Sequence, residues 1–151
     1  MHVVDANVLV YAANADCDEH EVCHSLLDHW RAGPLPWYLT WPIVYEFLRV
    51  VTHPRVLSAP WTLVRGWELI EGLAASPGLS FLQATSRHRE VARATFSAYP
   101  DLRGNLVHDA HTAVLMREHG IRTIYTRDTD FHRFPFLEVI DPLRPPATRS
   151  E

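Results

Sequence analysis

Four acidic side chains stand at remote places in this 151-residue chain, and each has apolar sequence beside it: Asp5, Glu46, Asp109 and Asp128. Asp5 ends the apolar run HVVDA, and Asp128 follows an apolar, β-branched run at residues 121–126. Glu46 and Asp109 lie three or four residues from apolar neighbours, so we expect both on apolar helix faces. An ionised carboxylate beside a core is costly unless it is paired or binds a cation.

Each acid also has an ordinary local explanation. Asp5 fits a turn or helix cap, Glu46 fits an ion pair with Arg49, and Asp109 fits an acid in the first turn of a helix. Asp128 with Asp130 fits a turn in which the side chain of the first residue binds the backbone of the second. Singly, these explanations suffice.

Taken together, the four acids indicate one shared acidic pocket. Carboxylates that close would repel one another and raise their pKa values, and a divalent cation removes that conflict. Oxygen ligands without cysteine suit Mg²⁺, or alternatively Mn²⁺, rather than Zn²⁺. Such a cation binds phosphate oxygens and lowers the pKa of bound water, so phosphodiester hydrolysis is the leading reaction class.

The elements that must position these acids alternate along the chain. Five short apolar runs predict strands, at residues 2–6, 37–40, 79–83, 121–126 and 137–140. Cap and proline signals predict helices at residues 18–30, 42–52, 60–75 and 87–99, and one more between Asn105 as N-cap and Gly120 as terminator. This alternation predicts an α/β domain with a mainly parallel sheet, whose sites lie at the carboxyl ends of strands.

Composition narrows the function further. The net charge is −4, so no overall basic field indicates nucleic-acid binding, although all 14 basic residues are arginine. No apolar run approaches the roughly 18 residues of a membrane span. The two cysteines, six residues apart, form no disulfide framework, and no signal peptide is evident, so a cytoplasmic protein is expected. We predict one domain at residues 1–143 and a mobile tail at residues 144–151.

Four stretches carry a resemblance to a known family: VVDANVLVYA, IVYEFLRVVTHPRV, NLVHDAHTAVLMREHG and IYTRDTDFHRFPFLEVIDPL. In this order they resemble the PIN-domain nucleases, and specifically the VapC-like ribonuclease toxins of toxin–antitoxin pairs. The family pattern of Asp, Glu, Asp and Ser/Thr-x-Asp falls on the four acids, with Thr126 before Asp128. The resemblance implies a five-stranded, mainly parallel sheet between helices, in three α/β/α layers.

The resemblance also implies roles. Asp5 and Asp109 would be the principal metal ligands, with Glu46 and Asp128 completing the catalytic set directly or through water. Asn7 and Thr126 would hydrogen-bond behind these ligands. The role of Asp130 stays open, with a turn residue as the alternative. Candidates for substrate contact, from their place near the acids, are Arg49, His108 and Arg127; ion pairing is the alternative for the arginines.

The sequence therefore predicts a Mg²⁺-dependent endoribonuclease toxin with RNA as substrate, a small antitoxin as partner, a homodimeric state and no membrane association. One alternative is a PIN-like nuclease outside toxin–antitoxin systems, acting on DNA or in RNA maturation. Another is a catalytically inactive module of this family that binds RNA or protein. A phosphotransfer domain using Asp5 as nucleophile is disfavoured, because such sites usually place a lysine near the phosphate and the chain has none.

Overall fold

Five parallel strands form the centre of the molecule in the computed structural model, which describes residues 1–144. The strands are β1 (His2–Val4), β2 (Trp37–Thr40), β3 (Leu79–Leu82), β4 (Thr123–Tyr125) and β5 (Glu138–Ile140). They lie in the order β3-β2-β1-β4-β5, and every neighbouring pair is parallel. The predicted five-stranded α/β fold is confirmed; β2 has the predicted bounds, and the other four strands are slightly shorter than predicted.

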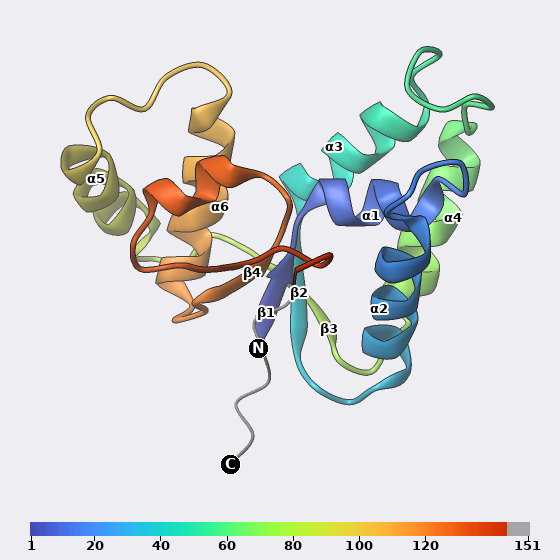
Figure 1. Cartoon of the computed structure of the whole chain (residues 1–151). Helices are drawn as coiled ribbons and strands as arrows, with labels where there is room; N and C mark the ends of the chain where they lie inside the picture. Colours follow the sequence, from blue (N-terminus) through green and yellow to red (C-terminus); the bar gives the residue numbers. More distant parts are fainter. Residues whose placement is uncertain (145–151) are drawn as a thin grey trace.

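Helices cover the sheet on both sides (Figure 1). The described helices are α1 (Ala6–Ala13), α2 (His20–Ala32), α3 (Trp41–Val51), α4 (Leu63–Ala74), α5 (His88–Ala98), α6 (Leu106–Glu118) and the short 3-10 helix η1 (Thr129–Arg133). Helices α1 to α4 pack against one another on one side, while α5, α6 and η1 gather on the other. Within residues 1–144, no helix has the length and apolarity to span a membrane.

The order in which the chain adds strands to the sheet changes direction at β1. Strands β2 and β3 lie on one side of β1, whereas β4 and β5 lie on the other. In open parallel sheets such a reversal opens a crevice at the carboxyl ends of the two central strands. The residues that follow β1 and β4 therefore meet at this point, and they include Asp5 and Thr126 to Asp128.

Local signals explain where several helices begin and end. Thr40 caps α3 by accepting the backbone N–H of Ile43 at 3.2 Å, and Thr62 caps α4 through the N–H of Arg65 at 3.2 Å. Gly120, with a φ of +67°, ends α6 in the left-handed conformation that glycine adopts without strain. Asn105 stands at the predicted N-cap of α6, but its side chain makes no capping hydrogen bond.

Helix α1 is an α-helix that the sequence prediction did not assign. Five of its eight residues are buried, so it shows no polar face from which a helical period could be read. The prediction for the next helix began at residue 18, two residues before α2 starts at His20. Beyond Arg144, the tail predicted at residues 144–151 lies outside the described residues.

Candidate active site

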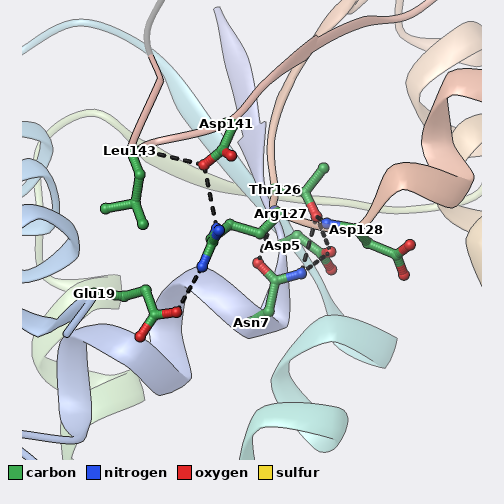
Figure 2. A network of polar contacts seen from close by, with 8 residues as sticks. All are labelled: Asp5, Asn7, Glu19, Thr126, Arg127, Asp128, Asp141 and Leu143. Carbon is green, nitrogen blue, oxygen red and sulfur yellow. Dashed lines mark hydrogen bonds and ion pairs between the residues drawn. The ribbon is translucent and has the colours of Figure 1, made fainter. Parts of the chain in front are cut away.

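Asp5 is the first acid of the site, and it is held by hydrogen-bond donors from the ends of two adjacent strands (Figure 2). As N-cap of α1, its Oδ1 accepts the backbone N–H of Ala6 at 2.8 Å. Its Oδ2 accepts Asn7 Nδ2 at 2.9 Å and the Thr126 hydroxyl at 2.6 Å. These three donors fix the carboxylate in one orientation between β1 and β4.

Thr126 is 1% exposed, and its hydroxyl makes every hydrogen bond available to a hydroxyl. It donates to Asp5, and it accepts Asn7 Nδ2 and the backbone N–H of Asp128, both at 2.9 Å. Asn7 in turn accepts the backbone N–H of Arg127 through Oδ1 at 3.3 Å. The structure thus places Asn7 and Thr126 directly against the acid that they were predicted to support.

Asp128 and Asp130 follow in a tight turn at the start of η1. Asp128 caps this helix, with its Oδ1 accepting the backbone N–H of Asp130 at 2.8 Å. The turn that was one reading of this pair is therefore present. Asp130 also lies 3.6 Å from Arg133 as an exposed ion pair. One oxygen of each carboxylate nevertheless stays free to face a neighbouring group.

A third carboxylate, that of Asp109 in the first turn of α6, joins this pair. One oxygen each from Asp109, Asp128 and Asp130 lies within 4.8 Å of the other two. Mg²⁺ binds oxygen at about 2.1 Å, so its opposite ligands stand about 4.2 Å apart. The trio matches that span with little side-chain movement. It contains Asp130, whose role the sequence left open, and not Asp5, which was predicted as a principal ligand.

The acids influence one another electrostatically. Burial is the main reason why the pKa of Asp109 rises to about 7, and the charges of four other acids add to it: Asp128, Asp5, Asp130 and Glu46. Burial likewise raises the pKa of Asp5 to about 6, although its hydrogen-bond donors act in the opposite direction. All four predicted acids, with Asp130, therefore belong to one electrostatically coupled group.

Glu46 differs from the prediction in its burial. The buried stripe of α3 consists of Ile43, Val44, Phe47, Leu48 and Val51, and Glu46 lies outside it. Its side chain is 51% exposed and lies 3.6 Å from Arg49, so the expectation of an apolar surrounding was wrong and the ion pair is present. Glu46 therefore lies at the rim of the acidic group, and its charge helps to raise the pKa of Asp109.

The three candidates for substrate contact lie in different surroundings. His108 is exposed on the first turn of α6, next to Asp109. Arg49 is 68% exposed beside Glu46, at the rim of the acidic group. Arg127 points away from the acids toward Glu19 and Asp141 (Figure 2). No local pattern indicates these last two partners, since they lie 108 and 14 positions from Arg127.

Two hollows lie elsewhere on the molecule. One of about 240 Å³ is lined by residues of α1, α2 and α4 together with Trp61. The other, about 450 Å³, lies between α2, Tyr125 and Pro142. The acidic group is in neither of these two hollows.

Comparison with known proteins agrees with this fold. A model of the PIN domain matches residues 2–137. Ribonuclease VapC48 of Mycobacterium tuberculosis is 38% identical over 138 residues, which are 91% of this chain and 94% of that protein. Ribonuclease VapC37 of the same organism is 31% identical over 134 residues, covering 89% and 92%. The chain belongs to the PIN domain family, among relatives named VapC ribonucleases.

Solved structures share the fold at lower identity. Mycobacterium tuberculosis VapC20, described as a Sarcin-Ricin loop cleaving toxin, matches 92% of this chain and 98% of its own, with a TM-score of 0.63 and 21% identity. VapBC2 from Rickettsia felis, bound to a DNA fragment from its promoter, matches 91% and 96%, with a TM-score of 0.62 and 14% identity. These likenesses establish the architecture.

Proposed function

We propose that this protein is a metal-dependent endoribonuclease toxin of a type II toxin–antitoxin pair. The observation that carries the proposal is the acidic group at the carboxyl ends of β1 and β4. Three of its carboxylates lie within 4.8 Å of one another, and the charge of a fourth, Asp5, contributes to the raised pKa of Asp109. The relatives named as VapC ribonucleases support RNA as the substrate.

The residues present fit a divalent cation. Asp109, Asp128 and Asp130 would hold it, with Asp5 beside them directly or through water. The donor set is all oxygen, which suits Mg²⁺ or Mn²⁺. The proximity of the three carboxylates supports a shared cation, and burial with neighbouring charge raises the pKa of Asp109 to about 7. When bound, the cation would supply charge stabilisation at the phosphate and acidify water.

The protein side chains would divide the remaining work. Asn7 and Thr126 keep the Asp5 carboxylate in one orientation, so it presents a fixed charge to the phosphodiester. Glu46, at the exposed rim, has the freedom to accept a proton from the attacking water. Arg49 and His108 stand on the surface beside the acids, where phosphate oxygens of a bound strand would pass.

A small antitoxin is the partner that this proposal requires, and a homodimer is the expected state of the free toxin. Support for the antitoxin comes from a fold relative that was solved as a toxin–antitoxin complex from Klebsiella pneumoniae. An antitoxin that covers the acidic group would block RNA, so co-expression should relieve growth arrest.

The test is to sequence RNA 5′ ends after brief expression of the wild-type chain, Asp5→Asn and the exposed control Asp101→Asn. We expect discrete new ends with wild type and Asp101→Asn, and none with Asp5→Asn. Purified wild type should cut RNA in Mg²⁺ and stop in EDTA. Equal cleavage by wild type and Asp5→Asn would overturn the proposal, and cleavage of DNA alone would favour a nuclease outside toxin–antitoxin systems.

A further inference from the structure

Arg127 lies between Thr126, which contacts Asp5, and Asp128, which belongs to the acidic group. Its own side chain extends away from that group (Figure 2). Its Nη1 lies 2.5 Å from Glu19 Oε1, and its Nε lies 3.3 Å from Asp141 Oδ1. The exposed fractions of the Arg127, Glu19 and Asp141 side chains are 31%, 21% and 31%. One guanidinium therefore faces two shielded carboxylates.

The two carboxylates come from segments far apart in the chain. Glu19 immediately precedes α2, and Asp141 immediately follows β5. Asp141 is itself held, because its Oδ1 accepts the backbone N–H of Leu143 at 3.0 Å. Through Arg127, the turn after β4 is thus fastened to the start of α2 and to the end of β5.

The backbone of Arg127 continues this connection to the acids. Its N–H donates to Asn7 Oδ1 at 3.3 Å, and Asn7 holds Asp5 and Thr126 through its amide hydrogens. The N–H of the following residue, Asp128, donates to the Thr126 hydroxyl at 2.9 Å. A shift of the Arg127 backbone would disturb both Asp5 and Asp128.

We propose that Arg127 is a positioning residue, whose ion pairs with Glu19 and Asp141 hold the turn that aligns Asp5 and Asp128. We propose this role in place of the substrate contact predicted from the sequence, because the Arg127 guanidinium is paired with two acids on the far side of the turn. The proposal rests on the proposed function insofar as it concerns cleavage, but the geometry of the turn can be measured without RNA or metal.

The experiment uses Arg127→Met, Arg127→Lys and the triple variant Arg127→Met with Glu19→Gln and Asp141→Asn. The triple variant removes the two acids that Arg127→Met leaves unpaired, so it stays informative if the single variant folds poorly. Arg122→Met is the matched control, because Arg122 is exposed and precedes β4, whereas Arg127 follows it. Readouts are kcat, KM, and amide hydrogen exchange at residues 126–130 in metal-free protein.

We expect Arg127→Met and the triple variant to lower kcat about 10- to 100-fold, the scale of a misplacement of about 1 Å, with KM within about twofold. Arg127→Lys should recover part of kcat, since it restores the charge but not the two-pronged geometry. Exchange of the Arg127 and Asp128 amides should accelerate in the Arg127→Met and triple variants, and stay unchanged in Arg122→Met.

A rise in KM with unchanged kcat would overturn the proposal and make Arg127 a substrate contact. Unchanged amide exchange in the triple variant would overturn it as well, whatever the kinetics. If wild type cuts no RNA, the proposed function fails, but faster exchange in the variants would still establish that Arg127 holds the turn.

Discussion

The two ends of α6 carry two carboxylates in opposite circumstances. Asp109, near its start, lies among four other acids, and burial together with their charges raises its pKa to about 7. Glu118, at its end, has a side chain with no exposed surface, yet its pKa lies below the ordinary value. Burial raises the pKa of Glu118, but hydrogen bonds from His88 and Thr85 outweigh that effect.

Burial raises the pKa of both carboxylates, and the hydrogen-bond donors around Glu118 reverse the direction there. Glu118 accepts His88 Nδ1 at 2.6 Å, the Thr85 hydroxyl at 2.7 Å and the Thr85 backbone N–H at 3.0 Å. These contacts join Thr85 and the first residue of α5 to the end of α6. The groups near Asp109 include four other acids, whereas those near Glu118 are hydrogen-bond donors. A buried acid with its own donors stabilises the fold, whereas a buried acid among acids is prepared for a cation.

Asp109→Asn should show the largest effect on function. Removing one carboxylate from the trio should lower RNA cleavage by about 10²- to 10³-fold, the range seen when one preorganised stabilising group is removed. The metal-free variant should be at least as stable at pH 8 as wild type, because a crowded charge has been removed. Cleavage assays and urea unfolding measure the two effects; wild-type rates in this variant would refute the assignment.

Thr126→Val should come next, since it keeps the shape but removes the hydroxyl that binds Asp5, Asn7 and Asp128. We expect kcat to fall by about 10- to 100-fold, as for groups that orient metal ligands. KM should change little. Thr123→Val, on the same segment but with its hydroxyl on the exposed Glu138, is the control. Equal losses in both variants would show a general effect on β4 instead.

Glu118→Gln tests the stabilising carboxylate at the end of α6. We expect the free energy of unfolding to fall by about 1–3 kcal/mol, because the change weakens a shielded, charge-assisted set of hydrogen bonds. Cleavage per folded molecule should stay at the wild-type rate. Denaturant unfolding and active-site titration provide the two numbers. A loss of activity without loss of stability would place Glu118 in the catalytic group.

The pH dependence of the free energy of unfolding tests the raised pKa of Asp109, with a smaller expected effect. A raised folded-state pKa means that the folded protein binds the Asp109 proton more tightly than the unfolded chain, whose value is 3.8. Stability from this group is gained as pH falls from about 7 toward 4, and lost as pH rises.

Burial lowers the pKa of His2 to about 4, so His2 acts with the opposite sign. The informative quantity is therefore the difference between wild type and Asp109→Asn. Metal-free wild type should lose stability relative to the variant between pH 5 and 8. A difference that is flat across this range would contradict the raised pKa of Asp109.

Local chemistry explains why much of the fold was predictable. Pro42 marks the start of α3, and Gly120 marks the end of α6, because each acts within one turn of itself. Helix α1 escaped prediction because burial on most sides erases the period of a surface helix. A mainly parallel sheet, by contrast, was predicted from the alternation of strands and helices, whereas the strand order came only from the structure.

The site was predictable where residue type and strand ends coincide, as for Asp5 and Asp128. Glu46 was placed on the apolar face because spacing alone does not locate the centre of the buried stripe, which runs through Val44 and Phe47. Asp130 could be found from its Asp-x-Asp spacing in the turn, but not assigned. The bond of Arg127 to Glu19 depends on how the completed fold brings remote segments together, which no local pattern contains.

The most direct test of the acidic group as a cation site is a Mn²⁺ titration of purified chain, followed by the electron paramagnetic resonance of free Mn²⁺. Wild type and Glu118→Gln should bind with equal dissociation constants, while Asp109→Asn should bind at least about tenfold more weakly. Equal binding by Asp109→Asn, or no binding by wild type at millimolar Mn²⁺, would contradict the account.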